Sequence, residues 1–380
     1  MKKSIVEALF DVEFTKGALL FFAQNSPSYL QPEEVVHDKN IYPNKKTFLY
    51  FEPIGTIAAI KPWNFPFDLP IWSCIAPALM AGNAVILKPS PLTTKTGELI
   101  EDIFLQAGAS EGLIQTIIGD DEVGKELVQV EGIDMISFTG SIKTGHSIAS
   151  ECAKMGKKYV LEMGGKDVAI VFPDCDIKTT LNGITMHGFM NNGQVCTSIE
   201  RLLIHKNIYK EFLDKLILKV KEITPVPFAN KNQFLIVRKQ LEEAVQTGCH
   251  ILIGGKNFDE DKNIIEPTIL ECIDTSLDIW QKESFGPVLA VRSFETVEQV
   301  IRLANNSIYG LGASVWTNNI DIFSSLAKKL EVGMVWQNEA NLPFLEGVWT
   351  GWKQSGFGVS LGKHGTRVYT KIKQISESIF

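Results

Sequence analysis

The sequence predicts an α/β protein built on parallel sheets. From residue 54 onward, short apolar runs of strand length alternate with longer segments of helical period. Strands that are separated by helices imply a parallel sheet with crossover helices. The alternation resumes after residue 168 in a different order, which indicates a second α/β unit. With 380 residues, the chain is long enough for two or three domains.

The start of the chain is predicted to be a helix followed by a polar connection. Residues 27–46 are polar and contain three prolines, which favours a loop or an exposed ribbon. Residues 4–24 are predicted to form an amphipathic helix. Its apolar side chains lie on roughly one face: Ile5, Leu9, Val12, Leu19 and Phe22.

The first α/β unit is predicted to contain five strands and four helices. Its longest apolar stretch, residues 69–82, contains Pro70 and Pro77 and is shorter than the ~20 residues that span a bilayer. We therefore expect a buried helix there and no membrane partner. The predicted strands are 54–60, 84–88, 114–118, 135–138 and 159–161, and the helices are 69–81, 96–107, 122–128 and 145–155.

The second α/β unit also alternates strands with helices. In the tail at 366–379, apolar and polar residues alternate enough to predict an edge strand. The predicted strands are 168–172, 201–204, 250–253, 288–293 and 313–316, and the helices are 177–190, 209–223, 239–247 and 297–304.

Composition and cysteine usage exclude several classes of protein. The net charge of -7 argues against a nucleic-acid binder, which is usually basic. The six cysteines show neither C-x-x-C nor zinc-finger spacing, so we expect no metal site and no disulfide framework. Glu7 and Asp11 interrupt any signal-peptide apolar region. We therefore expect a reducing compartment and place the protein in the cytoplasm.

Cys196 is a candidate nucleophile. The run before it is polar and carries Gly193, which indicates a turn that presents the side chain. On general grounds, however, a lone cysteine is more often a small buried hydrophobe. Glu162 precedes two glycines that leave room for a water, although it could equally pair with Lys166. A nucleophilic thiol with a separate carboxylate suggests covalent catalysis in two steps.

Two further polar residues stand in turns that suit catalysis or ligand binding. Asn64 lies between prolines and aromatics in PWNFP, where its amide could stabilise an oxyanion or simply satisfy the turn backbone. Glu283 lies in ESFGP, where it could bridge ribose hydroxyls or be a solvated loop residue.

Two strand ends could bind a nucleotide. Lys88 ends a strand before Pro89, where a nucleotide lies in parallel sheets, but an ordinary surface lysine would look the same. Residues 139–145, TGSIKTG, close a strand and open a helix, which makes an anion site at the helix N-terminus. Ser141 is a good N-cap, so a plain capped turn is the other interpretation, and it is favoured on this segment alone.

Taken together and in order, these segments resemble the NAD(P)-dependent aldehyde dehydrogenase superfamily, over nearly the whole chain. The resemblance implies a Rossmann-type cofactor domain, a catalytic domain and a small oligomerisation β-ribbon. The matching pieces are PWNFP at 62–66, KPS at 88–90, FTGS at 138–141, LEMGG at 161–165, GQVC at 193–196, ESFGP at 283–287, NSIYGL at 306–311 and KQSGFG at 353–358. The implied boundaries are 1–32 and 53–161 for the cofactor domain, 33–52 with 366–380 for the ribbon, 162–350 for the catalytic domain and 351–365 for a return to the cofactor domain.

The resemblance also implies oxidation of an aldehyde to the acid, through a thioester and with hydride transfer to NAD or NADP. Cys196 would be the nucleophile and Glu162 the general base, while Asn64 and the backbone N–H of Cys196 would form the oxyanion hole. Lys88 and Glu283 would hold the adenosine and nicotinamide riboses. The remaining cofactor-binding residues would be Trp63, Ser90, Gly140, Ser141, Gly145 and Phe285.

The chain departs from the family pattern in three places. It starts late, so the opening segment of a typical member is expected to be missing. A helix-to-helix connection is expected to be shortened near 223–235. Pro91 stands where many NAD-preferring members have a glutamate, so NADP is not excluded.

Further expectations concern the substrate, the oligomeric state and two alternative functions. The sequence looks most like the succinate-semialdehyde and related small-aldehyde branch, and a homodimer or homotetramer is expected. A CoA-acylating relative is disfavoured by Glu162, because a water-activating base is needed only for hydrolysis. A shortened chain that no longer catalyses is the other alternative. The expected substrate pocket is mostly apolar: Phe67, Met190, Val195, Thr197, Trp349 and Trp352.

Overall fold

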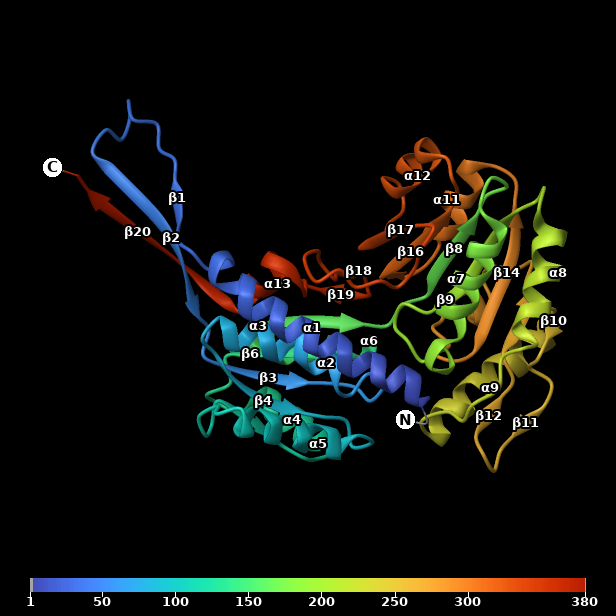
Figure 1. Ribbon diagram of the computed structural model, residues 1–380, viewed down its shortest axis with the longest axis horizontal. Helices are drawn as coiled ribbons and strands as arrows, with labels where there is room; N and C mark the ends of the chain where they lie inside the picture. Colours follow the sequence, from blue (N-terminus) through green and yellow to red (C-terminus); the bar gives the residue numbers. More distant parts are fainter. Residues whose placement is uncertain (1–2, 380) are drawn as a thin grey trace. The chain divides into compact units, whose positions relative to one another are not determined.

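A computed structural model describes residues 3–379 and divides the chain into two compact units. Unit 1 comprises Glu162–Leu342, Thr350–Gly356 and the described residues up to Glu7. Unit 2 comprises Ala8–Leu161, Pro343–Trp349 and the chain from Phe357 onward. Among residues 3–379, none of the helices combines the length and the hydrophobicity that a membrane span needs. The predicted α/β class with parallel sheets is confirmed (Figure 1).

Unit 2 contains a six-stranded sheet in the order β19-β7-β6-β3-β4-β5. The strand β3 pairs in parallel with β4 and β6, and β4 pairs in parallel with β5. The strands are β3 (Thr56–Ile60), β4 (Ala84–Lys88), β5 (Ile114–Thr116), β6 (Met135–Gly140), β7 (Lys158–Met163) and β19 (Gly356–Phe357). The helices are α1 (Ile5–Tyr29, in this unit from Ala8 onward), α2 (Asp68–Pro70), the π-helical η1 (Ile71–Ile75), α3 (Ala76–Met80), α4 (Thr94–Gln106), α5 (Asp121–Gln129), α6 (Ile142–Met155) and α13 (Gly362–Val368).

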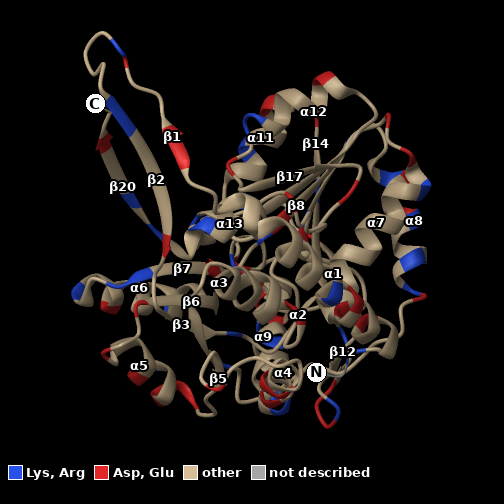
Figure 2. Ribbon diagram, turned by 60° about the vertical axis from the view of Figure 1, so that its left-hand side comes forward, with Lys and Arg blue, Asp and Glu red and all other residues tan. Residues whose placement is uncertain are grey.

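The register of this sheet brings the motifs PWNFP, KPS and FTGS to the same end of the strands. Ile60 of β3 lies opposite both Lys88 of β4 and Phe138 of β6. The turns after these strands therefore leave the sheet together, at the carboxyl ends where parallel sheets bind ligands. The helix α5, which opens with acidic residues, belongs to the same unit (Figure 2).

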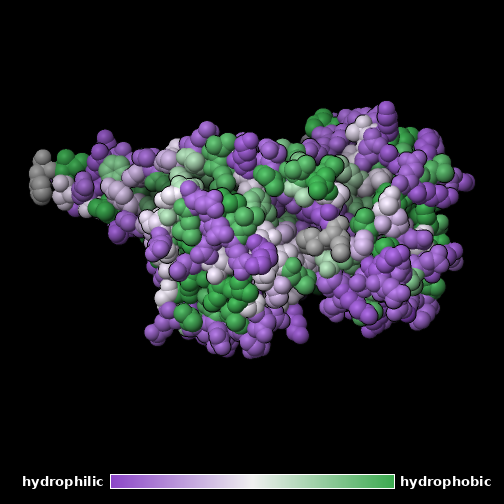
Figure 3. Space-filling view, turned by 60° about the horizontal axis from the view of Figure 1, so that its bottom comes forward, coloured by the Kyte–Doolittle hydropathy of each residue, from purple (hydrophilic) through white to green (hydrophobic). Residues whose placement is uncertain are grey.

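Unit 2 also carries a three-stranded antiparallel ribbon, made of β1 (Glu33–Val35), β2 (Lys45–Pro53) and β20 (Thr370–Ser378). The strands β2 and β20 pair along nine residues, although they come from opposite ends of the chain. Hydrophobic side chains are exposed along this ribbon (Figure 3). The predicted edge strand at 366–379 is wrong at its start, because α13 occupies the chain up to Val368 and the strand begins at Thr370.

The predicted helix forms, over Ile5–Tyr29, but of the five residues on the predicted face only Phe22 is buried. Ile5, Leu9 and Val12 are 78%, 60% and 46% exposed. The buried residues are Asp11, Thr15, Ala18, Phe21, Phe22 and Ser26, most of which also recur at helical spacing. Most of these are small or polar, so a pattern based on hydrophobicity selects the wrong side of the helix.

Unit 1 contains a seven-stranded sheet in the order β10-β13-β14-β9-β8-β16-β17. All its pairs are parallel except β10 with β13. The sheet strands are β8 (Asp167–Val171), β9 (Ile199–His205), β10 (His250–Ile253), β13 (Thr268–Glu271), β14 (Val288–Phe294), β16 (Gly312–Trp316) and β17 (Met334–Gln337), with shorter pieces β11 (Phe258–Asp259), β12 (Ile264–Ile265), β15 (Tyr309–Gly310) and β18 (Trp352–Lys353). The helices are α7 (Ile177–Phe189), the 3₁₀ turn η2 (Met190–Gly193), α8 (Tyr209–Val220), α9 (Lys231–Gln246), α10 (Asp278–Gln281), α11 (Val297–Asn305) and α12 (Ile320–Ala327).

Two buried apolar clusters pack against this sheet. One includes Leu203, Trp280 and Val315, and the other includes Ile184, Leu202 and Trp316. Leu202 and Leu203 are neighbours on β9, so both faces of the central strand are covered. That arrangement explains the almost continuous apolar runs by which the strands could be predicted.

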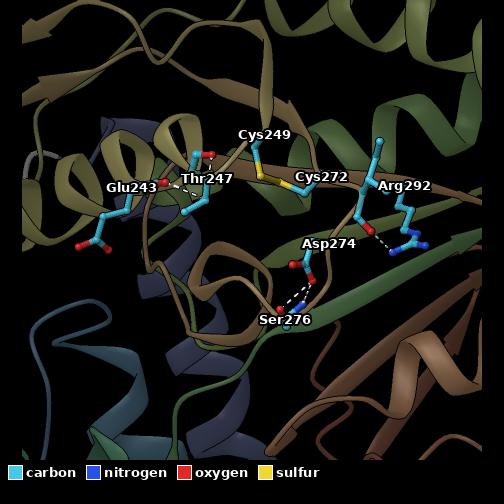
Figure 4. Close-up of a disulfide and its surroundings, with 9 residues drawn as sticks. Glu243, Thr247, Cys249, Cys272, Asp274, Ser276 and Arg292 are labelled. Carbon is cyan, nitrogen blue, oxygen red and sulfur yellow. Dashed lines mark hydrogen bonds between the residues drawn. A yellow bond between two sulfur atoms is a disulfide. The ribbon is translucent and has the colours of Figure 1, made fainter.

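A disulfide is present, whereas the cysteine pattern predicted no disulfide framework. Cys249 and Cys272 are bonded, with 4.7 Å between their Cα atoms (Figure 4). They directly flank the opposed pair His250 and Glu271 of the antiparallel strands β10 and β13. Opposed residues of such a pair are close enough for a bridge, and a separation of 23 residues gives no motif that would reveal it.

Candidate active site

Cys196 lies in unit 1 on the connection from α7 to β9, after a turn of unusual backbone conformation. Asn191, Asn192 and Gly193 have φ of 50°, 60° and 68° in succession. Asparagine and glycine reach this left-handed region at least cost. A Cβ at Gly193 would lie 2.1 Å from the carbonyl oxygen of Gly286, so no other residue fits there. The sequence NNG therefore shapes the turn that leads to the thiol.

Two glycines allow three segments of unit 1 to converge around Cys196. A Cβ at Gly165 would lie 2.3 Å from the carbonyl oxygen of Cys196. A Cβ at Gly164 would lie 2.4 Å from Oε2 of Glu283. These contacts bring the LEMGG segment, which carries Glu162, against both the thiol loop and the ESFGP loop. The close approach gives the physical reason for the two glycines.

The carboxylate of Glu162 acts directly on the thiol of Cys196. Burial raises the pKa of Cys196 well above its ordinary value, and the negative charge of Glu162 raises that pKa further. The thiol is therefore protonated at neutral pH and stands beside a group that can take its proton. Cys196 is only partly buried, whereas the free cysteines Cys74, Cys152 and Cys175 are buried.

Glu283 is not a solvated loop residue. Its carboxylate accepts a hydrogen bond of 3.0 Å from the N–H of Gly165, and its own N–H donates to the hydroxyl of Tyr309 at 3.3 Å. Burial raises the pKa of Glu283 to about 8, with a further contribution from the charge of Glu200. Phe285, two residues on, has a φ of 52°.

The alternative in which Lys166 pairs with Glu162 is wrong. Lys166 forms a buried ion pair with Glu200, and the two side chains are 1% and 2% exposed. Nε of Arg201 donates to the carbonyl oxygen of Lys166 at 2.8 Å. Lys166 was predicted only as a partner for Glu162, and no role was predicted for Glu200 or Arg201. The available signal was two charged residues inside an apolar strand, because such charges are buried only when they are paired.

Lys88 in unit 2 is not an ordinary surface lysine. It ends β4 and is 4% exposed. Burial lowers the pKa of Lys88, while the carboxylates of Asp121 and Asp120 oppose that shift. A Cβ at Gly124 would lie 3.4 Å from its Cε, so α5 packs along the lysine stem. The ammonium group thus stands at the carboxyl end of β4, beside an acidic helix start.

The turn from β6 to α6 in unit 2 has the predicted cap. The hydroxyl of Ser141 accepts a hydrogen bond of 3.3 Å from the N–H of Thr144, and Gly145 donates to the carbonyl oxygen of Ser141 at 2.9 Å. Gly140 is the last residue of β6. The start of α6 offers backbone N–H groups and a positive dipole end, which suit a phosphate.

The other site residues predicted in unit 2 lie in the turns after β3 and β4, at the carboxyl ends of strands in the same sheet. Ser90 comes two residues after β4, and its hydroxyl accepts from the N–H of Leu92 at 3.3 Å. In the turn after β3, Asn64 is 3% exposed and Trp63 is partly buried. Their roles, like those of Ser90, Gly140 and Gly145, stay predictions.

The predicted substrate-pocket residues differ in burial. In unit 1, Val195 and Thr197 are buried, and the hydroxyl of Thr197 donates to Oδ1 of Asn341, whereas Trp352 is 53% exposed. In unit 2, Trp349 packs edge-to-face on Trp72 with 5.9 Å between ring centroids. Phe67 and Met190 are partly buried. Which of these side chains contact the substrate stays a prediction.

Residues 1–375 match the model of the family described as the aldehyde dehydrogenase family. The chain belongs to this family. It is 39% identical over 344 residues to the peroxisomal aminoaldehyde dehydrogenase 1 of Pisum sativum, covering 87% of this chain and 68% of that relative. It is also 36% identical to the betaine aldehyde dehydrogenase of Bacillus subtilis over 88% of this chain and 71% of that relative.

Solved structures of aldehyde dehydrogenases share the fold. The betaine aldehyde dehydrogenase of Staphylococcus aureus in complex with NAD+ superposes with a TM-score of 0.93 at 32% identity, over 99% of this chain and 77% of that one. The lactaldehyde dehydrogenase of Escherichia coli gives a TM-score of 0.92 at 31% identity, over 97% and 79%. This chain therefore spans about two thirds to four fifths of the length of these relatives.

Proposed function

We propose that this aldehyde dehydrogenase oxidises an aldehyde to the carboxylic acid through a thioester on Cys196. The observation that carries the proposal is the close approach of the Glu162 segment to the thiol loop within unit 1, where a Cβ at Gly165 would lie 2.3 Å from the carbonyl oxygen of Cys196 and the charge of Glu162 acts on the thiol. A protonated thiol is a weak nucleophile, and an adjacent carboxylate can remove its proton when the substrate arrives. The family membership supplies the reaction class.

Two residues of the chain carry the covalent steps. Glu162 accepts the thiol proton, and the sulfur of Cys196 attacks the aldehyde carbon, so that the carbonyl π electrons move to oxygen. The backbone N–H of Cys196 is a donor for that oxyanion, and the resemblance predicts Asn64 as another. Loss of hydride from the carbon gives the thioester. Glu162 passes the thiol proton to solvent and, ionised again, takes a proton from a water molecule. The resulting hydroxide attacks the thioester carbon, the carbon–sulfur bond breaks, and the thiolate takes a proton, which leaves the acid and the free thiol.

NAD(P)+ supplies the hydride acceptor when it is bound. The chain's residues fit such a group. In unit 2, the buried ammonium group of Lys88 would hold a ribose, and the capped start of α6 at Ser141 would hold phosphate. In unit 1, the carboxylate of Glu283 would accept hydrogen bonds from a ribose, with Phe285 supporting the nicotinamide.

The substrate we propose is a small aldehyde. The relatives named above act on aminoaldehydes, betaine aldehyde and lactaldehyde. We propose the aminoaldehyde class first, because the relative from Pisum sativum is 39% identical, and we keep succinate semialdehyde as the alternative. A cytoplasmic location likewise remains a proposal.

Replacement of the thiol tests the proposal. Purified protein would be assayed for NAD(P)H formation with an aminoaldehyde, betaine aldehyde, succinate semialdehyde and propanal, and with either cofactor. We expect Cys196→Ala to abolish turnover and Cys175→Ala, which removes another free thiol of unit 1, to retain it. Full activity of the Cys196→Ala protein would refute the assignment.

The same assay separates the two alternatives. Turnover that requires added CoA and yields an acyl-CoA would identify an acylating enzyme. No NAD(P)H from any aldehyde in the wild-type protein would favour the alternative of a chain that folds without catalysing.

A further inference from the structure

We propose that Lys166 and Glu200 are positioning residues, which fix the loop Glu283–Pro287 and thereby aim the Glu283 carboxylate at the cofactor. The inference rests on the proposed function, since it assumes that Glu283 binds a cofactor ribose. Neither residue belongs to the set assigned to the reaction above. Both lie in unit 1, as does the loop that they hold.

The ion pair binds the loop at two successive residues. Oε2 of Glu200 accepts a hydrogen bond of 2.8 Å from the N–H of Ser284, and Oε1 accepts one of 2.8 Å from the N–H of Phe285. Nζ of Lys166 pairs with Glu200 and also donates to the hydroxyl of Ser284 at 3.0 Å. Both oxygens of one carboxylate are therefore used to anchor the residues next to Glu283.

The anchored loop has a conformation that needs such support. Phe285 has a φ of 52°, in a region that a bulky residue rarely occupies without surrounding restraint. Its N–H is bound by Glu200, and Nε2 of Gln233 donates to the carbonyl oxygens of Ser284 and Phe285 at 2.8 and 3.3 Å. Nε2 of Gln240 holds the carbonyl oxygen of Glu283 at 3.0 Å. With its backbone fixed on both sides, Glu283 can reach the N–H of Gly165.

An ionised carboxylate suits this task better than an amide of the same shape. A carboxylate only accepts hydrogen bonds, and each of its oxygens meets an N–H donor. An amide would offer one oxygen and would turn its NH₂ group toward a backbone N–H or toward Lys166. Lys166 places a positive charge against the Glu200 carboxylate in a site where both side chains are at most 2% exposed. Lys166 and Glu200 therefore hold the loop together, as one ion pair.

The charges of the pair also act on Glu283, in opposite directions. The charge of Glu200 raises the pKa of Glu283, and the charge of Lys166 lowers it. The other groups that interact with Glu283 are Glu162, Asp167, Cys196 and Tyr309. Since the pKa of Glu283 is about 8, its ionised form gains population as the pH rises through that value, and the KM for NAD(P)+ is expected to fall there.

The test compares Glu200→Gln and Lys166→Met with a matched surface pair. Lys206 and Glu295 form an ion pair of 3.0 Å in the same unit with side chains 52% and 61% exposed, so Lys206→Met and Glu295→Gln are the controls. The KM for NAD+ and for the aldehyde, kcat, and the rate of Cys196 alkylation by iodoacetamide without cofactor would be measured across pH. We expect Glu200→Gln to raise the KM for NAD+ about tenfold, with the aldehyde KM and the alkylation rate within about twofold of wild type.

The pH profile separates positioning from general support of the fold. The KM for NAD+ is expected to fall as the pH rises through about 8. We expect the pH of this fall to move lower in Glu200→Gln and higher in Lys166→Met. A shift of both in the same direction, an unchanged KM for NAD+, or an equal rise in both KM values would overturn the inference. If either variant fails to fold, Ser284→Ala removes only the hydroxyl that Lys166 binds, and we expect it to raise the KM for NAD+ about threefold.

Binding measurements keep this inference distinct from the proposed function. NAD+ affinity would be measured by tryptophan fluorescence without an aldehyde. If the wild-type protein binds NAD+ but oxidises no aldehyde, the proposed function fails, while a weakened affinity in Glu200→Gln still supports the positioning role. Equal affinity of the wild-type and Glu200→Gln proteins would contradict that role.

Discussion

The charge of Glu162 raises the pKa of the Cys196 thiol, although Glu162 is the base proposed to deprotonate this thiol. We therefore expect replacement of Glu162 to ease ionisation of the thiol and yet to slow turnover. The negative charge of Glu162 adjoins Cys196, so removal of the charge in Glu162→Gln should lower the thiol pKa. We expect the midpoint of Cys196 alkylation by iodoacetamide to move to lower pH in that variant. Turnover should nevertheless fall by about 10²–10⁴-fold, because no base remains to activate water.

Mass spectrometry would complete the measurement on Glu162→Gln. At a pH above its alkylation midpoint, where the Cys196 thiol ionises without a base, a thioester that forms but is not hydrolysed should accumulate on Cys196. Cys196→Ala serves as the unlabelled control. An alkylation midpoint that moves to higher pH, or turnover at the wild-type rate, would contradict the role assigned to Glu162.

The residues of this site could be predicted to different extents. Cys196, Glu162 and Glu283 stand out because each lies among glycines, and the structure brings them together in unit 1. The partner of Lys166 could not be predicted, because Glu162 is four positions away in the sequence whereas Glu200 reaches it only through the pairing of β8 with β9. A buried ion pair depends on strand register, which local sequence does not encode.

At the scale of elements, the acidic start of α5 should influence the choice of cofactor. Asp121 and Asp120 act on the ammonium group of Lys88. Negative charge there would repel the extra phosphate of NADP, although Pro91 alone leaves that cofactor open. We expect Asp121→Asn to raise kcat/KM for NADP+ relative to NAD+ about fivefold, as for an exposed charge at a helix end.

Two features of α5 make that measurement specific. Asp120 should be left intact, because its carboxylate caps the helix by accepting from the N–H of Glu122 at 3.1 Å. Glu122→Gln is the control, since Glu122 pairs with the exposed Lys125. An unchanged ratio of the two cofactors in Asp121→Asn, or a wild-type enzyme that prefers NADP+, would show that α5 does not discriminate.

Elements could be predicted where burial and hydrophobicity coincide. The central strands β8 and β9 are covered on both faces and appear as apolar runs. In other elements, residues outside the apolar pattern determine where the element begins. The helix α9 begins at Lys231 instead of the expected residue 239, because Asn230 caps it by accepting from the N–H of Gln233. Very short or half-exposed strands such as β17 give too weak a pattern to be separated from loops.

At the scale of the whole molecule, the ribbon of β1, β2 and β20 is the part whose stability unit 2 alone does not explain. After Thr370, every described residue of β20 is exposed, so neither face of this strand is covered. Ile372 and Ile375 are 67% and 39% exposed and lie opposite Phe51 and Phe48 of β2. An isolated ribbon of this kind is marginally stable in water, which supports the expectation that further copies of the chain cover it.

Light scattering during size-exclusion chromatography would test this expectation. We expect wild-type protein to elute at two or four times 42.2 kDa, and Ile372→Lys or Ile375→Lys to shift it toward the monomer. Each buried isoleucine contributes about 1.5–3 kcal/mol, and a dimer loses that amount twice. The two positions lie on opposite faces of β20, so the variant with the larger effect identifies the covered face. Gln374→Lys is the control for added charge, and a wild-type mass equal to that of one chain would rule out the expected assembly.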